Sequence, residues 1–188
     1  MSDSSRVLHR RQLLATTGAA LGGLAFAHAA LGQQTGAAAL EPRLVHLVDI
    51  SLAVESPLDV GNAPVGARQI YPVTGGSFEG EALRGTVLPG GADWLVRRPD
   101  GVSELDVRIT MRTDDEQLIY GRYRGLIDGN PVRLPTTADA EPLPAPYWRI
   151  TPIFETGSER YAWLNRIISV GVGSSAAGRV DYTVYAVR

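Results

Sequence analysis

The stretch that decides the fold is residues 104–112, which read Glu-Leu-Asp-Val-Arg-Ile-Thr-Met-Arg. Apolar side chains occupy every second position, and charged or polar side chains occupy the positions between them. Because successive side chains of a β-strand point to opposite faces, this period of two is typical of a strand with one buried side. The sequence therefore predicts a half-buried β-strand here.

Similar alternation or β-forming composition recurs on both sides of this stretch. We expect further strands at residues 44–54, 68–73, 78–88, 94–96, 118–126, 147–154, 167–172 and 179–187. The expected breaks between them are rich in Gly, Pro and Asp, and the clearest are residues 59–66, 75–76, 89–91 and 98–101. Residues 127–146 lack periodicity and predict a long surface loop, a candidate lid. Residues 158–166 predict one short helix with Ser158 as its N-cap.

These elements predict an all-β domain of nine or ten short strands with one short helix. Short connections favour antiparallel pairing, because parallel strands need crossover helices and the sequence offers only one helix. Closing such a sheet removes its exposed edges. We therefore expect a small up-and-down, calycin-like β-barrel, and a two-sheet sandwich is the alternative that the sequence leaves open.

Residues 1–32 have the order of a twin-arginine signal peptide. Arg10 and Arg11 directly precede an uncharged run rich in Ala, Gly and Leu, as in export leaders. Small residues place the cleavage site after Ala29 or after Gly32. A membrane anchor is the alternative, which the Gly and Thr content of the run and the lack of a positive flank disfavour.

The leader sets the expected organisation and partners of the chain. We expect residues 33–40 to form a linker and residues 41–188 to form a single β-barrel domain. The expected partners of residues 1–32 are the twin-arginine export machinery and signal peptidase. The mature protein is then periplasmic or secreted, with no stable membrane span after cleavage.

The composition excludes several kinds of catalytic residue and metal site. The chain has no Cys, its 18 basic residues are all Arg, and His46 is the one His beyond the leader. These absences exclude thiolate nucleophiles, lysine Schiff bases and metal sites built from Cys or several His. Acidic side chains outnumber arginines beyond the leader, which argues against a nucleic-acid partner. We expect no metal and no cofactor.

Several segments together resemble the domain-of-unknown-function 3237 family, the uncharacterised UPF0311-type β-barrel proteins. They are residues 73–80 (Val-Thr-Gly-Gly-Ser-Phe-Glu-Gly), 83–94 (Leu-Arg-Gly-Thr-Val-Leu-Pro-Gly-Gly-Ala-Asp-Trp), 98–101, 113–115, 151–157 and 161–165. The resemblance runs from about residue 41 to the C-terminus and implies a small antiparallel barrel with a central cavity. One departure is Glu116, which stands where the family commonly has Gly in an Asp-Asp-Gly turn.

Asp93 and Trp94 are the first candidates for a functional site. A carboxylate beside a large aromatic ring could present an acid or base at the edge of an apolar cavity, where desolvation raises its pKa. The alternative is structural, with Asp93 bonding backbone amides and Trp94 packing in the core. The nearby Gly pairs lack the pattern of a phosphate-binding loop and suit bulges or close strand crossings.

Other candidates lie further along the chain. Arg108 and Tyr120 could stabilise an oxyanion, and Arg149 could hold a ligand oxygen through its planar guanidinium. Arg108 could instead belong to a charged outer face. Aromatic side chains complete the candidate ligand-binding set: Trp94, Phe154, Tyr161 and Trp163. For Phe154, Tyr161 and Trp163 the first expectation is structural, namely that they tie the helix across one end of the barrel. Residues 114–116 form an acidic turn without the spacing of a calcium loop.

Three functions remain open from the sequence. The first is an exported barrel that binds a small, partly apolar molecule. The second is a cofactor-independent lyase or isomerase acting on a small organic acid or aromatic-type compound, with Asp93 as acid or base. The third is a structural or interaction protein with a filled barrel. The sequence leaves open whether the protein is an enzyme.

Overall fold

The computed structural model describes residues 41–132, 142–143 and 145–188. The predicted leader and linker, and residues 133–141 and 144 of the predicted long loop, lie outside the described residues. The leader, the linker and the suggested role of the loop as a lid therefore stay predictions. Within the described ranges, no helix is long and apolar enough to cross a lipid bilayer.

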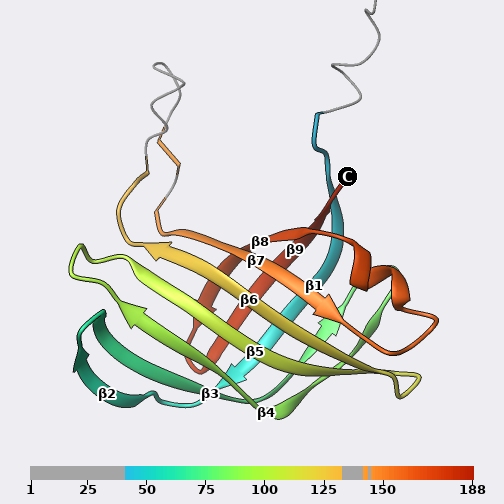
Figure 1. Ribbon diagram of the computed structural model, residues 1–188, viewed down its shortest axis with the longest axis horizontal. Helices are drawn as coiled ribbons and strands as arrows, with labels where there is room; N and C mark the ends of the chain where they lie inside the picture. The colour runs from blue at the N-terminus through green and yellow to red at the C-terminus, as the bar shows by residue number, and fades with distance from the viewer. Residues whose placement is uncertain (1–40, 133–141, 144) are drawn as a thin grey trace, which may run out of the picture. The chain divides into compact units, whose positions relative to one another are not determined.

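Nine strands form one antiparallel sheet in this part of the chain (Figure 1). They are β1 Leu44–Val54, β2 Leu58–Ala63, β3 Gly66–Glu79, β4 Arg84–Arg97, β5 Ser103–Thr113, β6 Leu118–Asp128, β7 Tyr147–Glu155, β8 Ser169–Ala176 and β9 Arg179–Val187. From β2 to β9, each strand pairs with the next strand along the chain. This order is that of an up-and-down meander.

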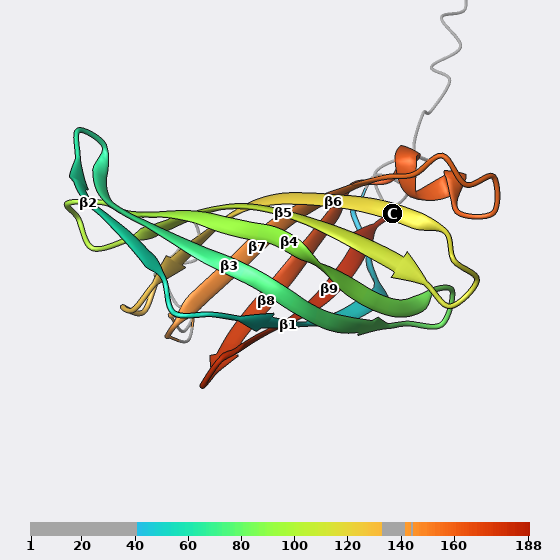
Figure 2. The same cartoon turned by 90° about the horizontal axis from the view of Figure 1, so that it is seen from below.

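The sheet closes into an eight-stranded barrel because β1 pairs with both β9 and β3. Strand β3 pairs first with β2, through residues 66–70, and then with β1, through residues 73–79. Strand β2 is therefore an extra strand outside the ring, and Figure 2 shows it projecting from one end of the barrel. The predicted antiparallel barrel is confirmed, and the sandwich alternative is wrong because the ring of hydrogen-bonded strands is continuous.

Strand β5 contains the alternating stretch and turns its apolar side chains into the barrel. The four apolar side chains are each at most 3% exposed: Leu105, Val107, Ile109 and Met111. The intervening side chains are exposed or half-buried. Burial of alternate positions is what the period of two predicted.

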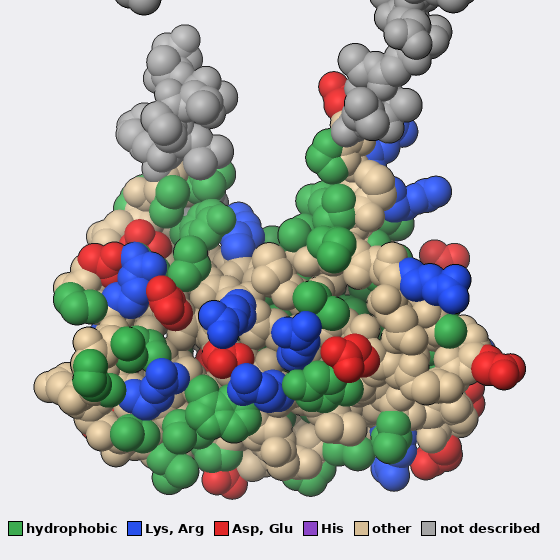
Figure 3. Space-filling model, in the orientation of Figure 1, with side chains coloured by type: hydrophobic (Ala, Val, Ile, Leu, Met, Phe, Trp, Pro, Cys, Tyr) green, Lys and Arg blue, Asp and Glu red, His purple; other side chains and the backbone are tan. Residues whose placement is uncertain are grey.

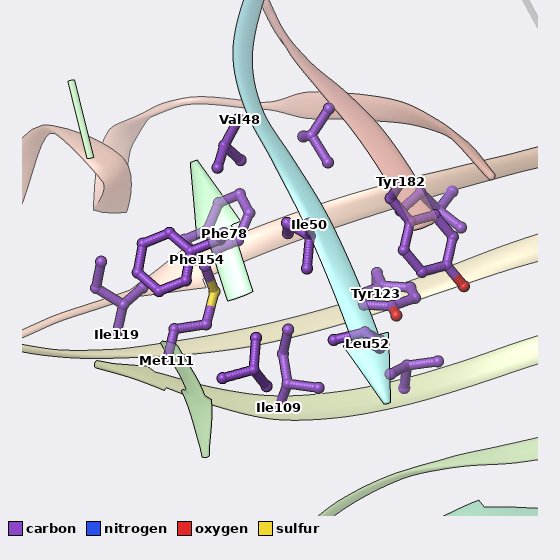
Figure 4. Packing of buried hydrophobic residues seen from close by; sticks show 14 of the residues in the cluster. Val48, Ile50, Leu52, Phe78, Ile109, Met111, Ile119, Tyr123, Phe154 and Tyr182 are labelled. Atoms are coloured by element: carbon purple, nitrogen blue, oxygen red, sulfur yellow. The ribbon is translucent and has the colours of Figure 1, made fainter. Parts of the chain in front are cut away.

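The barrel interior has one half that is tightly packed. There, large apolar side chains from opposite strands meet, and Figure 4 shows Phe78, Met111 and Phe154 gathered beside Ile119. A short 3-10 helix, η2 (Ala162–Arg166), connects β7 to β8 and buries Leu164. The other half of the interior is open and forms the cavity described below.

Three local predictions are wrong. Part of residues 59–66 belongs to β2, because it pairs with β3 as a hairpin. The Gly-rich pairs do not end strands, since β3 and β4 run through them and the chain turns instead where the Gly80 N–H donates to the Leu83 carbonyl (2.9 Å). The helix is a 3-10 turn that begins after Tyr161, and no side chain caps it. Its period of three brings Tyr161 and Leu164, both buried, to one face.

The Gly pairs are bulges and close strand crossings, as predicted. Pairing of β3 with β4 shifts register between Val73 and Gly76, and pairing of β4 with β5 shifts between Leu88 and Ala92. A Cβ built on Gly76 would lie 2.1 Å from the Ser51 carbonyl oxygen, on the strand that closes the barrel. Only glycine allows the two backbones to approach this closely.

Candidate functional site

The open half of the barrel contains a cavity of about 540 Å³. All eight ring strands contribute residues to its lining, and the β1–β2 and β8–β9 connections contribute to its rim. The side chains that line it are mainly apolar and aromatic, and they include Leu52, Tyr71, Val73, Asp93, Leu95, Leu105, Val107, Tyr123, Trp148, Val180 and Tyr182. A volume of this size is in the range that encloses small organic ligands.

Asp93 is the carboxylate inside this cavity. It is half-buried on β4, and the backbone N–H of Asp106 donates a hydrogen bond to its Oδ1 (3.1 Å). Burial raises the pKa of Asp93 to about 7, and the nearby Asp106 charge acts in the same direction. The Asp106 N–H and the Arg68 guanidinium lower that pKa, but they do not offset the loss of water.

Two phenols lie near Asp93, and a third aromatic side chain packs against one of them. The ring of Tyr182 is 5.2 Å from that of Tyr123 and 5.8 Å from that of Trp148, both edge-on. Burial raises the pKa of both phenols, and the negative charge of Asp93 raises each further. Figure 4 shows the two phenol oxygens on the side of the cluster away from Met111 and Phe154. The charge of the Asp93 carboxylate therefore influences the protonation of both phenols.

Two of these polar groups are buried without a partner. Among the described residues, neither the Tyr123 hydroxyl nor the Trp148 indole N–H makes a hydrogen bond. Tyr123 is 4% exposed and Trp148 is 7% exposed. Unpaired buried donors are costly, and they are rare in native structures outside functional sites.

Register and a missing Cβ bring this group together. Residues that pair across antiparallel strands share a face, and one ladder runs across β3 to β6 through Tyr71, Asp93, Val107 and Tyr123. On β8, which pairs with β7, Gly173 makes room for Trp148, because a Cβ there would lie 2.6 Å from the indole ring. The local alternation of each strand thus points the four polar groups into the same space.

The charged residues of the cavity other than Asp93 lie at its rim. Glu55, Arg97 and Arg179 line the opening and are exposed. The Arg179 Nε is 2.9 Å from the Asp181 carboxylate. The polar groups of the cavity floor are therefore distinct from the charges of the rim. These floor groups are Asp93, Tyr123, Trp148 and Tyr182.

The structure places Trp94 and Arg108 away from Asp93. Both face the outside of the barrel, where the Arg108 guanidinium lies 4.9 Å above the Trp94 ring and 3.3 Å from the Asp106 carboxylate. The Arg108 side chain is 46% exposed. Figure 3 shows arginine and acidic side chains side by side on the outer face seen in that view. Arg108 thus belongs to a charged outer face, the alternative that the sequence left open.

Tyr120 and Arg149 also lie outside the cavity. Tyr120 lines a shallow surface hollow with Glu155 and Asn165. The Arg149 guanidinium lies 4.9 Å above the Tyr147 ring and donates to the carbonyl of Trp148 (2.9 Å). Neither residue is brought together with Asp93.

The remaining aromatic candidates lie in or near the packed half. Phe154 is part of the apolar cluster there. Tyr161 is buried beside η2, and its hydroxyl donates to Asp115 (2.9 Å). Trp163 is on η2 and is 36% exposed. None of the three lines the cavity.

Sequence reasoning missed Tyr123, Trp148 and Tyr182. A signal was present for Tyr182, since it alternates with Val180 and Val184 and so lies on the buried side of its strand. Nothing local indicates that β6, β7 and β9 bring the three rings together, because that depends on closure of the barrel.

Comparison with known proteins gives consistent matches. The sequence profile of the family described as "Protein of unknown function (DUF3237)" matches residues 42–187. A UPF0311 protein of Rhodopseudomonas palustris is 33% identical over 144 residues, which cover 76% of this chain and 94% of that protein.

Solved structures share the fold. A β-barrel-like protein of Acinetobacter baumannii is similar with a TM-score of 0.68 and 31% identity, covering 79% of this chain and 97% of that one. An enzyme of Penicillium herquei is similar with a TM-score of 0.59 and 21% identity, covering 78% and 95%. The likeness to the fungal enzyme shows the fold alone.

Proposed function

The chain belongs to the DUF3237 family of β-barrel proteins, and from that premise we propose that it binds a small, partly apolar molecule in the cavity beside Asp93. The observation that carries the proposal is an aromatic-walled cavity of about 540 Å³ with a buried carboxylate and unpaired donors at its floor. Apolar walls with few convergent polar groups are typical of ligand sites. The same cavity weighs against a structural role that needs a filled barrel.

The test is identification of molecules that co-purify with the full chain, by mass spectrometry. The comparison is with Val180→Trp, a variant that fills part of the cavity with a large ring. We expect a small molecule in the native protein and its loss from the folded variant. Recovery of the same molecule from both proteins would place binding elsewhere.

A second candidate function is acid–base catalysis without a cofactor, as in a lyase or isomerase. A carboxylate with a pKa of about 7 is suited to exchange protons at neutral pH. In this proposal the phenols of Tyr123 and Tyr182 take the oxyanion-stabilising role predicted for Arg108 and Tyr120, because they lie beside Asp93.

Asp93→Asn separates binding from catalysis. The amide keeps the acceptor for the Asp106 N–H but cannot exchange a proton at this pH. We expect the variant to retain the co-purifying molecule and to lose its conversion. Conversion at the native rate would exclude Asp93 as the acid or base.

The proposal includes export by the twin-arginine route to the periplasm or beyond. Its support is the sequence of residues 1–32, with Arg10 and Arg11 before an uncharged run. Changing both arginines to Lys keeps the charge but removes the paired-arginine signal. We expect precursor to accumulate in the cytoplasm, which fractionation and immunoblotting would detect, and normal export of the double variant would contradict the proposal.

A further inference from the structure

The floor of the cavity offers hydrogen-bond donors that lack a well-formed bond within the protein. The Tyr123 hydroxyl and the Trp148 indole N–H are buried and unpaired among the described residues. They come from adjacent strands, β6 and β7, and the ring of Tyr182 packs edge-on against both. The Tyr182 hydroxyl lies near both donors, whose polarity partly offsets the rise of its pKa on burial, but neither contact has hydrogen-bond geometry. An indole N–H can only donate, so the group that satisfies this floor must supply an acceptor atom.

The charges around the cavity indicate that this acceptor is uncharged. The cationic side chains among the described residues that line the cavity are Arg97 and Arg179, and both are exposed at its rim. The charged group next to the donors is instead the carboxylate of Asp93. The Arg68 guanidinium acts on Asp93 but donates to the Trp94 carbonyl (2.7 Å) and does not line the cavity. A ligand carboxylate at the floor would therefore lie in low dielectric beside a like charge, with no cation of the lining beside it.

We propose that the cavity takes an uncharged carbonyl compound with an apolar, ring-sized body, whose oxygen accepts hydrogen bonds from Tyr123 and Trp148. The inference rests on the proposed function, since it names the class of molecule that the cavity binds. The apolar body packs against the side chains of Tyr71, Leu105 and Val107.

The test uses three probes of nearly equal shape, measured by isothermal titration calorimetry at pH 8. They are 2-acetylnaphthalene, its isostere 2-isopropenylnaphthalene, in which C=CH₂ replaces C=O, and the anion 2-naphthoate. We expect the ketone to bind about tenfold more tightly than the alkene, because only the ketone accepts hydrogen bonds. The carboxylate is expected to bind more weakly than the ketone.

Two variants assign the preference to the floor. Tyr123→Phe removes one donor and keeps the ring, so we expect the ketone-to-alkene ratio to fall toward one. Tyr185→Phe is the matched control, because this phenol lies on β9 outside the cavity, and it keeps the native ratio. If Tyr123→Phe does not fold, the three probes on the native protein still decide the matter.

The outcomes separate this inference from the proposed function. Equal binding of the ketone and the alkene would overturn the inference while the cavity remained a ligand site. Tightest binding of 2-naphthoate would overturn it in favour of recognition by the rim arginines. Binding of none of the three would overturn the inference and, for molecules of this size, the proposed function with it.

Discussion

Asp93 illustrates at the scale of one residue how burial changes side-chain chemistry. Its carboxyl group loses water on folding and gains one backbone hydrogen bond, and the net effect is a pKa of about 7 in place of 3.8. Between those values the folded state holds a proton that the unfolded state releases. The free energy of unfolding therefore falls as pH rises from about 4 to about 7.

Asp93→Asn should remove this loss of stability. At low pH the variant and the native protein are expected to be similarly stable, since both groups are uncharged. At pH 8 we expect the variant to be more stable, by up to ~4 kcal/mol for a shift of this size. Urea denaturation across pH 4–8 measures the difference.

The control is Asp49→Asn, an exposed carboxylate that lies 3.1 Å from His46 on the outside of β1. It should show no such gain. A native protein whose stability does not decline relative to Asp93→Asn between pH 4 and 8 would mean that Asp93 is solvated.

Asp115 is the opposite case at the same scale. The Thr113 hydroxyl, the Tyr161 hydroxyl and the Arg160 guanidinium hold the pKa of Asp115 below its ordinary value. The stability from these contacts is present above the ordinary carboxyl pKa and is lost as pH falls through the lowered value. The contacts join the β5–β6 turn to the segment before η2.

Tyr161→Phe should lower the melting temperature at neutral pH by about 2–4 °C, because one hydrogen bond to a carboxylate is lost. The difference from the native protein should shrink in acid, once Asp115 is protonated. Calorimetry at both pH values tests this, with Tyr185→Phe as a control. An unchanged melting temperature would show that the bond does not hold this end of the barrel.

At the scale of the strands, a close contact between β7 and β8 sets the position of the Trp148 indole at the cavity floor. Gly173 on β8 lies against the Trp148 ring on β7, and a Cβ at that position would lie 2.6 Å from the indole Nε1. The indole can therefore occupy its present position at the cavity floor only while residue 173 has no side chain.

Gly173→Ala should displace Trp148 and cost about 1–3 kcal/mol through overpacking. We also expect it to weaken binding of any molecule that the floor donates to. Gly129→Ala is the matched control, since nothing lies within 4 Å of a Cβ there. Denaturation and calorimetry would contradict the interpretation if both variants behaved alike.

Closure of the barrel is a property of the whole molecule. It depends on the crossing of β1 and β3, where Gly76 meets the backbone of Ser51 and no side chain can move to make room. The neighbouring Gly75 has a similar backbone, with φ of 154° against 147°, but its nearest obstacle is 3.7 Å away.

Gly76→Ala should therefore destabilise the barrel far more than Gly75→Ala. Both substitutions strain the backbone, but only the first forces the closing strands apart, and we expect it to cost roughly 2–4 kcal/mol more. Thermal unfolding monitored by near-UV circular dichroism compares the two. Equal losses would mean that strain at φ, and not strand approach, limits closure.

The amino-acid sequence by itself determined the class of fold and the facing of most strands. Alternation in residues 104–112 predicted that Leu105 and Val107 point into the barrel, because side-chain direction in a strand depends only on local geometry. For Arg108 the sequence left two positions open, and one of them was the outer face. The same local chemistry indicated Asp93. A resemblance carried by the Gly-Gly-Ala-Asp-Trp segment led to the family.

Only the tertiary structure decided what surrounds Asp93. The bulge between Leu88 and Ala92 and the pairing of β4 with β5 turn Asp93 inward and Trp94 outward, and closure through β1 and β3 brings Tyr123, Trp148 and Tyr182 to it. These contacts join residues far apart in the chain. They depend on how the eight strands are aligned with one another in the closed barrel. No local pattern in the sequence encodes that alignment.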